Sequence, residues 1–300
     1  MSTFTLTFVI FCARIVAKYF VFEVIMNPFL IAVIIAVSVL LVFFLVFLFL
    51  IKPNCKRREE MKKFASVKYA HRGLHNAERA ENSMSAFAAA TDAGYGIELD
   101  VRLTKDGELV VFHDTTLDRV TEGKGRVDLK TLAELRELHL SGTADTVPTF
   151  GEVLSLVGGR VPLLVEIKEE TTKCSVTEKT LELLADYKGD VVIESFNPAA
   201  LKMVKERAPH LLRGILSQNF FEEKNHRTPL YFLLQILLLN VICRPDFVSF
   251  NHLHYKNAAL RLVRRLFRTP TVAWTVKTEE EARAAISHGF DGVIFENFSA

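Results

Sequence analysis

The sequence predicts an α/β protein built on a parallel sheet. From residue 67 onward, short apolar segments typical of strands alternate with segments of helical periodicity, and this alternation is typical of parallel sheets covered by helices. Eight such strand units favour a (β/α)8 TIM barrel, although an open doubly wound sheet fits the alternation almost as well. The expected core strands are 67–70, 96–103, 161–167, 191–194, 212–216, 247–250, 271–276 and 292–295.

Composition narrows the class of protein. The chain has 300 residues, of which 50% are hydrophobic, and its formal net charge is +2. A charge this close to zero argues against a nucleic-acid-binding protein. The cysteines lie far apart without the spacing of a metal site, which indicates isolated thiols in a reducing compartment. They are Cys12, Cys55, Cys174 and Cys243.

The hydrophobic excess lies at the N-terminus. Residues 28–51 carry no charge, and as a helix of ~36 Å they are long enough to cross a hydrocarbon core of ~30 Å. A secretory signal peptide is disfavoured because the apolar run is too long and lacks a small-residue cleavage site. Basic residues dominate 52–66, which we interpret as a linker on the cytoplasmic side of the membrane.

Residues 4–25 are also apolar but carry charged residues. They are compatible with a second span, with an interfacial helix, or with a stretch outside the native protein, since Met26 directly precedes the uncharged segment. N-terminal sequencing of the native protein that recovers residues before Met26 excludes the third alternative.

The expected domains are a membrane anchor over 1–51, the basic linker over 52–66, and a barrel domain over 67–300.

The densest group of polar residues lies between residues 69 and 121. The strand expected over 96–103 alternates apolar and polar residues, so Glu98 and Asp100 lie on the same face of it. Two carboxylates on one face suit a hard divalent cation with oxygen ligands. An acid pair at a strand end is by itself more often a solvated surface, so the interpretation depends on its neighbours.

A hairpin brings a histidine beside this acid pair. Asp106-Gly107 is a strong turn signal, and the extra strand expected over 109–112 leads back to His113. In the paired strands of this hairpin, His113 then lies opposite Glu98. If the pairing register shifts by one step, His113 lies opposite Asp100. Histidine suits proton transfer because its pKa lies near neutrality. With a second histidine at the end of the preceding strand, the combination indicates an active site.

Several motifs resemble the glycerophosphodiester phosphodiesterase family, and the resemblance extends from about residue 67 to the C-terminus. The fold of this family is the (β/α)8 barrel, which decides between the two sheet arrangements. Ala80 and Ser83 depart from the family, which commonly has Pro and Thr there; Ser83 keeps the hydroxyl. The motifs are His71-Arg72-Gly73, Glu81-Asn82-Ser83, Glu98-Leu99-Asp100-Val101, Thr104-Lys105-Asp106-Gly107, His113-Asp114 and Asp118-Arg119-Val120-Thr121.

The active site of such a barrel lies at the C-terminal ends of its strands. Glu98, Asp100 and Glu166 are expected there as ligands of a divalent cation, and the resemblance implies Ca²⁺ or Mg²⁺. The resemblance also places general acid and base roles on His71 and His113, without deciding which is which.

Three further side chains are expected to contact the substrate. Arg72 neutralises charge on the phosphoryl oxygens, Lys168 contacts a phosphate oxygen, and the family resemblance implies that Trp274 forms a wall for the glycerol. The structural alternatives are a surface ion pair for Lys168 and core packing for Trp274, which is the only tryptophan.

The expected function is metal-dependent hydrolysis of glycerophosphodiesters to glycerol 3-phosphate and an alcohol. One alternative is a lysophospholipase D activity on lysophospholipids, which a membrane anchor makes plausible. Another is a non-catalytic, membrane-tethered binding module. The expected location is the cell membrane, with the lipid bilayer as a partner and the catalytic domain in the cytoplasm; the leaving alcohol and the oligomeric state stay open.

The segment 230–242 is apolar almost all round, whereas an outer barrel helix should be apolar on one side. As one helix it is too short to span a bilayer. Either the preceding segment covers it, or it contacts the membrane or a second subunit, with Phe232 and Leu239 facing outward.

The other expected helices are 83–93, 129–138, 149–157, 178–187, 198–207, 257–267 and 278–288.

Overall fold

The computed structural model describes residues 3–222 and 227–298. The chain forms two compact units, Met1–Phe49 and Leu50–Ala300, and the first contains helix α1 (Thr3–Met26) and most of helix α2 (Pro28–Ile51). Among the described residues, α2 is the one helix whose length and apolar composition suffice to cross a membrane, a property that signal sequences share. The expected apolar helix is therefore confirmed, while the role of α1 stays a prediction.

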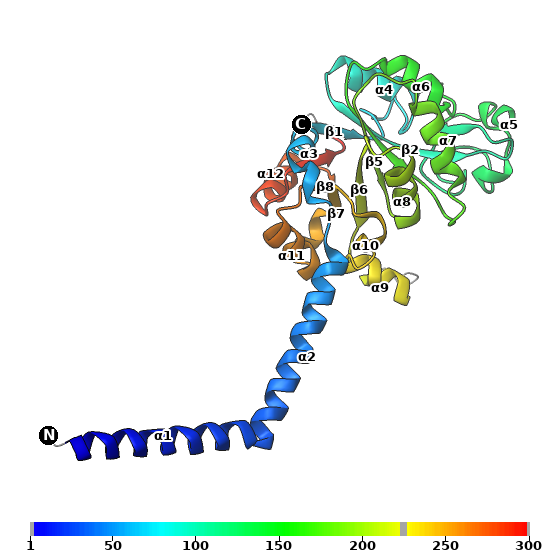
Figure 1. Ribbon diagram of the computed structural model, residues 1–300. Coiled ribbons are helices and arrows are strands. Elements are labelled where there is room, and N and C mark those ends of the chain that lie inside the picture. Colours follow the sequence, from blue (N-terminus) through cyan, green and yellow to red (C-terminus); the bar gives the residue numbers. More distant parts are fainter. Residues whose placement is uncertain (1–2, 223–226, 299–300) are drawn as a thin grey trace. The chain divides into compact units, whose positions relative to one another are not determined.

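The second unit is a closed parallel barrel (Figure 1). Because β1 pairs in parallel with both β2 and β9, the sheet closes on itself, which excludes the open doubly wound alternative. β3 is added to β2 in antiparallel orientation, so the barrel with a hairpin after its second strand is confirmed. The strands are β1 (Lys68–His71), β2 (Gly96–Leu103), β3 (Leu109–Val111), β4 (Leu163–Ile167), β5 (Val191–Ser195), β6 (Leu212–Ser217), β7 (Phe247–Asn251), β8 (Thr271–Val276) and β9 (Gly292–Phe295).

Helices on the outside of the barrel connect successive strands. The expected start of α6 is confirmed, because Thr149 and Glu152 form a reciprocal capping box there. The outer helices are α4 (Met84–Asp92), α6 (Phe150–Val157), α7 (Ser175–Leu184), α8 (Pro198–Arg207), α11 (Ala258–Phe267) and α12 (Glu279–Ser287).

The prediction of one helix over 230–242 is wrong. The segment forms α9 (Pro229–Gln235) and the short α10 (Asn240–Cys243). Leu237, between them, adopts a left-handed φ of 59°, which interrupts the helical path. Leu239, expected to face outward, is half-buried in this break.

The segment expected to be a basic linker, 52–66, is folded onto the base of the barrel. It contains helix α3 (Arg58–Ala65), in which Met61 and Ala65 are each 1% exposed. Gly292 lies so close to this helix that a Cβ there would be 1.8 Å from the carbonyl oxygen of Ala65. Met61, Phe64 and Ala65 share a core with one residue from each of seven barrel strands, namely Tyr69, Leu164, Val192, Leu212, Phe247, Val272 and Ile294.

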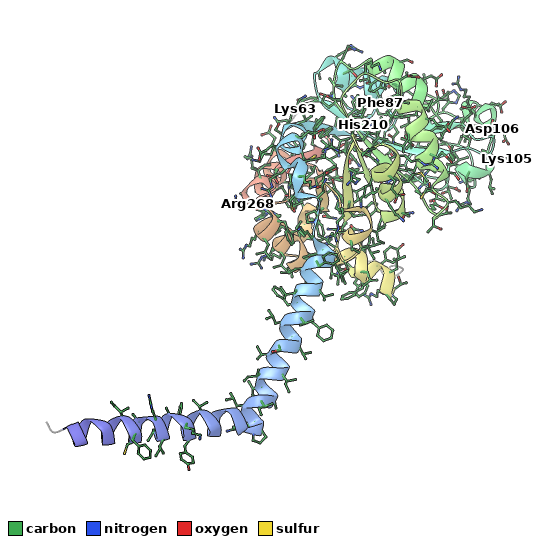
Figure 2. The ribbon with its side chains drawn as sticks, in the orientation of Figure 1. Lys63, Phe87, Lys105, Asp106, His210 and Arg268 are labelled. Atoms are coloured by element: carbon green, nitrogen blue, oxygen red, sulfur yellow. The ribbon has the colours of Figure 1, made fainter. Side chains whose placement is uncertain are left out.

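The hairpin after β2 has a different register from either one expected. Val101 lies opposite Val111, because the turn has three residues, with Gly107 in a left-handed φ of 82°. Asp106 in this turn lies at the outer edge of the unit (Figure 2), while His113 emerges beside β2. The segment between β3 and α6 includes η2 (Val127–Leu129) and α5 (Leu132–Arg136). It packs with the hairpin around a second core, which consists of Ala80, Val110, Phe112, Leu117, Val120, Val127, Leu135, Leu140 and Val147.

Candidate active site

Three acidic side chains converge near the C-terminal ends of β2 and β4. Glu98 and Asp100 lie on one face of β2, and the strand register aligns Asp100 with Glu166. One oxygen of each carboxylate lies within 4.8 Å of the others, and all three residues are buried. This carboxylate cluster of Glu98, Asp100 and Glu166 is a set of oxygen donors that suits a hard divalent cation.

Lys168 offsets part of the negative charge of the carboxylate cluster. Its Nζ lies 3.0 Å from Asp100 Oδ1 and 2.7 Å from Glu166 Oε1. Burial raises the pKa of Glu98 well above its ordinary value, and the charges of Asp100 and Glu166 add to this effect. For Asp100, burial also favours the neutral form, but Lys168 and other nearby cations outweigh it and hold the pKa well below its ordinary value. The cluster therefore gains from an additional positive charge.

Arg72 follows β1 in a left-handed conformation with a φ of 57°. Its backbone N–H donates to Glu98 Oε2 at 3.0 Å. Its guanidinium lies 2.6 Å from Glu81 Oε1 and 3.5 Å from Asp100 Oδ2. Asn82 Nδ2 also donates to Asp100 Oδ2, at 2.8 Å. The Glu81-Asn82 part of the motif therefore holds Arg72 and Asp100 in place.

His71 ends β1 and is paired with a carboxylate that follows the last strand. Its Nδ1 lies 2.9 Å from Glu296 Oε2, and its Nε2 lies 4.0 Å from Glu98 Oε2. Burial lowers the pKa of His71 more than Glu296 raises it, while the hydrogen bond from His71 holds the pKa of Glu296 at about 2. Near neutral pH, a neutral imidazole therefore donates its Nδ1–H to an ionised carboxylate.

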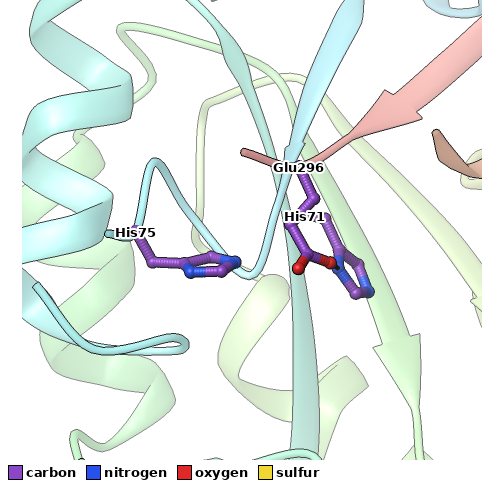
Figure 3. Close-up of side chains that lie close together, drawn as sticks. All are labelled: His71, His75 and Glu296. Carbon is purple, nitrogen blue, oxygen red and sulfur yellow. Dashed lines mark hydrogen bonds and ion pairs between the residues drawn. The ribbon is translucent and has the colours of Figure 1, made fainter. Parts of the chain in front are cut away.

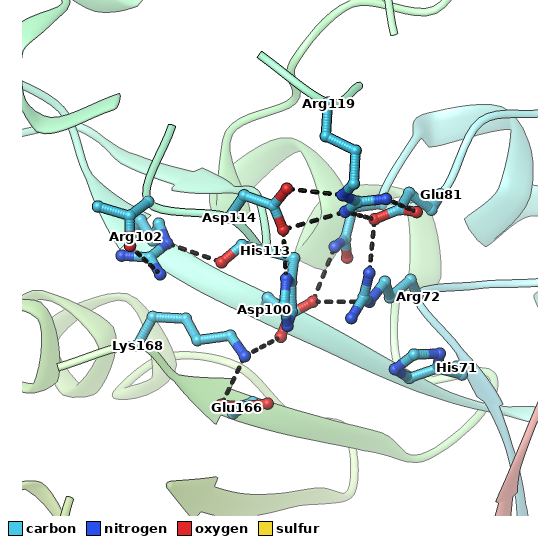
Figure 4. A network of polar contacts seen from close by, with 12 residues as sticks. His71, Arg72, Glu81, Asp100, Arg102, His113, Asp114, Arg119, Glu166 and Lys168 are labelled. Carbon is cyan, nitrogen blue, oxygen red and sulfur yellow. Dashed lines mark hydrogen bonds and ion pairs between the residues drawn. The ribbon is translucent and has the colours of Figure 1, made fainter. Parts of the chain in front are cut away.

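His113 forms a second pair of the same kind. Its Nδ1 lies 2.6 Å from Asp114 Oδ1, and burial lowers the pKa of His113 to about 4. Burial raises the pKa of Asp114, but hydrogen bonds from Arg119 and His113 outweigh it and lower this pKa to about 2. Arg119 also donates to both oxygens of Glu81. The ion pairs thus continue from His113 through Glu81 to Arg72 (Figure 4).

The polar groups line a pocket of about 100 Å³. Trp274 forms part of its wall with Phe196, whose ring lies edge-to-face at a centroid distance of 5.7 Å. Trp274 also packs against the core at the base of the strands, so it is both a core residue and a pocket residue. The lining consists of His71, Arg72, Glu98, His113, Glu166, Lys168, Glu194, Phe196, Leu216, Trp274, Thr275 and Ile294.

Several supporting residues had no role assigned from the sequence. Asp114, Arg119 and Glu81 lie within the motifs that carry the family resemblance. The motifs therefore contained these residues, but no function was assigned to them. Glu296 and Glu194 follow or end strands, where barrel sites are built. Glu194 is buried inside the barrel, and this burial raises its pKa to about 8.

The fold and the site together define a (β/α)8-barrel enzyme with the groups for cation-assisted acid–base chemistry at the C-terminal ends of its strands. Residues 71–300 match the family described as Glycerophosphoryl diester phosphodiesterase family. The chain belongs to this family, as its motifs indicate.

Relatives and solved structures agree with this assignment. The glycerophosphodiester phosphodiesterase of Caldanaerobacter subterraneus subsp. tengcongensis is 35% identical over 242 residues, which cover 76% of this chain and 93% of the relative. The glycerophosphodiester phosphodiesterase structure from Thermotoga maritima has a TM-score of 0.59 at 28% identity, covering 76% of this chain and 93% of that one. An Oleispira antarctica phosphodiesterase in complex with sn-glycerol-3-phosphate shares the fold, with a TM-score of 0.64 at 24% identity, over 78% of this chain and 94% of that one.

Proposed function

We propose that the chain hydrolyses glycerophosphodiesters and releases glycerol 3-phosphate and an alcohol. The observation that carries this proposal is the placement of two histidine–carboxylate pairs beside one buried carboxylate cluster. Family membership supports it, as does the name of the relative from Caldanaerobacter. A binding module without catalysis has no use for this complete set of acids and histidines.

Ca²⁺ or Mg²⁺ is the cofactor that we propose. The carboxylate cluster offers three oxygen donors within 4.8 Å of one another, and oxygen donors are the ligands that both ions prefer. Glu98, Asp100 and Glu166 would hold the ion. When bound, the cation would neutralise charge that develops on the phosphoryl oxygens.

His71 and His113 would divide the proton transfers. One imidazole is neutral and accepts the proton of the attacking hydroxyl at Nε2, and the other reacts in its protonated form and donates its Nε2 proton to the leaving alkoxide. In each pair, the bond from Nδ1–H to a carboxylate fixes the tautomer and leaves Nε2 as the atom that exchanges protons. Glu296 and Asp114 therefore act as positioning residues in this mechanism.

Arg72 and Lys168 would bind the phosphoryl group, and Trp274 would contact the glycerol. An ammonium group has three N–H donors. Lys168 places its Nζ near two carboxylates of the cluster, which leaves one donor for a phosphate oxygen. Arg72 lines the same pocket and adds a permanent positive charge on the other side of Asp100.

Lysophospholipids are a second candidate substrate class, because aromatic rings lead away from the pocket. Phe196 contacts Trp274 at a centroid distance of 5.7 Å and Phe220 at 5.9 Å. Phe220 in turn contacts Tyr231 of α9 at 5.1 Å. These ring contacts connect the apolar pocket wall with α9, and this aromatic cluster is the feature that favours a substrate with an acyl chain attached to the glycerol.

We further propose that α2 anchors the chain in the cell membrane with the barrel in the cytoplasm. The basic residues that follow α2 support this orientation. Asn240, the first residue of α10, donates to the carbonyl oxygen of Ile51 at 2.9 Å, a contact within the barrel unit, which begins at Leu50. Leu230 and Phe232 on neighbouring α9 are 56% and 44% exposed, so α9 is the element that we expect to contact lipid.

A substrate screen tests the proposed reaction. The full chain in detergent is incubated with glycerophosphocholine, glycerophosphoethanolamine, glycerophosphoglycerol or lysophosphatidylcholine, in Ca²⁺, Mg²⁺ or EDTA. Metal-dependent release of glycerol 3-phosphate from any of the first three supports the proposal. Release of choline from lysophosphatidylcholine alone supports the second substrate class, and no hydrolysis of any compound contradicts both.

A further inference from the structure

Three side chains that end or follow β1 and β9 form a group that the proposed reaction uses only in part. His71, His75 and Glu296 each place one ligand atom within 4.8 Å of the other two (Figure 3). None of them belongs to the carboxylate cluster. Two imidazoles and one carboxylate are a ligand set that proteins use for zinc and related transition metals.

The protonation states of these residues suit metal binding, which requires neutral imidazoles and an ionised carboxylate. Burial lowers the pKa of His71 and of His75, and this effect exceeds the opposing charge of Glu296. The hydrogen bond from His71 holds the pKa of Glu296 at about 2. The geometry shows the one proton that a metal in this group has to displace, the Nδ1 proton that His71 shares with Glu296 at 2.9 Å.

The backbone around these ligands is held in place. The N–H groups of Leu74 and Asn76, which flank His75, donate to backbone carbonyls at 3.0 and 2.9 Å. The N–H of Glu296 donates to a carbonyl of β8 at 2.9 Å, and Asn297 Nδ2 donates to Glu296 Oε1 at 3.2 Å. Asn297 therefore orients the carboxylate and leaves its Oε2 toward His71, as outer hydrogen bonds do in metal sites.

We propose that His71, His75 and Glu296 form a second cation site, which binds Zn²⁺ or a chemically similar divalent transition metal. Ca²⁺ and Mg²⁺ prefer the oxygens of the carboxylate cluster, whereas Zn²⁺ accepts imidazole nitrogen. A metal at Nδ1 of His71 takes the place of the proton there, and this proton moves to Nε2. Because a full catalytic cycle requires His71 to accept and donate a proton at Nε2, the metal inhibits turnover; this consequence rests on the proposed function.

Cobalt binding tests the second site without depending on catalysis. The full chain in detergent is saturated with Mg²⁺ and titrated with Co²⁺, whose visible absorption reports nitrogen ligands, and Zn²⁺ is then added to displace it. We expect one equivalent of Co²⁺ to bind, and His75→Gln to weaken its affinity at least about tenfold. His75→Gln should keep the Mg²⁺-supported turnover and lose the inhibition by Zn²⁺. The matched control is His210→Gln, which changes an exposed histidine elsewhere on the barrel and should bind Co²⁺ like the unmodified chain.

Two results contradict the second site: equal Co²⁺ affinity in His75→Gln and the unmodified chain, or complete displacement of Co²⁺ by excess Mg²⁺. Should His75→Gln not fold, His75→Asn and Glu296→Ala allow the same comparison of affinity. A chain that binds Co²⁺ through His75 but hydrolyses no glycerophosphodiester supports the metal site and contradicts the proposed function instead.

Discussion

The two histidines of the site obtain their carboxylate partners in different ways. Asp114 directly follows His113 in the chain, so this pair is already visible as a dipeptide motif. Glu296 is separated from His71 by 225 positions, and only the closure of the barrel between β1 and β9 brings the two together. Sequence motifs therefore predicted the surroundings of His113 better than those of His71.

The ion pairs of Arg119 predict a dependence of stability on pH. Burial opposes ionisation of Glu81, but Arg119 and Arg72 outweigh it and lower the pKa to about 2, from an ordinary value of 4.5. The unfolded chain therefore takes up protons at a higher pH than the folded chain. The stabilisation of the folded chain by the ion pairs of Glu81 is complete above about pH 5 and is lost as the pH falls toward 2. Arg119→Met should lower the free energy of unfolding near pH 6, and the difference from the unmodified chain should narrow between pH 5 and 3.

Urea unfolding at a series of pH values checks this prediction, with the fluorescence of the single tryptophan, Trp274, as the signal. Lys124→Met is the matched control, because it removes an exposed ion pair with Asp118 at 3.5 Å, and such pairs contribute little. A destabilisation by Arg119→Met that stays constant from pH 6 to pH 3 would falsify the explanation.

At the scale of elements, α3 should behave as part of the barrel. Met61 is 1% exposed in the core at the base of the strands, so Met61→Ala should lower the free energy of unfolding by about 2–5 kcal/mol. Lys62→Ala, at an exposed neighbouring position, should change it by less than about 0.5 kcal/mol. Urea unfolding of both variants measures this difference. Equal urea midpoints for Met61→Ala and Lys62→Ala would mean that α3 is only a linker.

The exposed apolar residues of α9 predict membrane contact by the barrel itself. A truncated chain that starts at Lys52 keeps α3 and should still associate with liposomes, while Leu230→Glu with Phe232→Glu should abolish this association. Co-sedimentation measures the bound fraction, and Trp274 fluorescence confirms folding. The matched control, Leu129→Glu with Leu266→Glu, changes two leucines that are 63% and 53% exposed elsewhere. A truncated chain that stays in solution when liposomes are present rules out the contact.

Two elements could not be predicted from the sequence for identifiable reasons. In 52–66 the abundant charged residues obscure the short apolar stripe that includes Met61 and Phe64. In 230–242 neither Gly nor Pro marks the break, and Leu237 adopts its left-handed conformation only where tertiary packing holds it buried. Helix caps and strands with clear periodicity, such as α6 and β2, were predicted because their signals are local.

At the scale of the whole molecule, alternation of strands and helices predicted the number of barrel strands but not their closure. An open sheet has the same local pattern, and only the pairing of β1 with β9 distinguishes the two. The carboxylate cluster was predictable because two of its acids share one strand and the third follows from the barrel. The network around Arg119 depends on side chains from several loops, which no local pattern specifies.

The basic segment after α2 predicts the orientation of the whole chain. Positive residues favour the cytoplasmic side, so a reporter fused after Ala300 should lie in the cytoplasm. Fusions of green fluorescent protein and of alkaline phosphatase check this, with fluorescence and no phosphatase activity expected. Phosphatase activity would contradict the predicted orientation and would mean that the barrel lies outside the cytoplasm.

The central claim is that His71 and His113 transfer protons beside a bound cation. The most direct measurement is the turnover of the preferred glycerophosphodiester by His71→Ala and His113→Ala, together with Ca²⁺ and Mg²⁺ binding by calorimetry. A positioned acid or base contributes about 10²–10⁴-fold, so each variant should lose about that much turnover. Cation affinity should persist, because the carboxylate cluster is intact. Turnover near that of the unmodified chain in both variants would contradict the account.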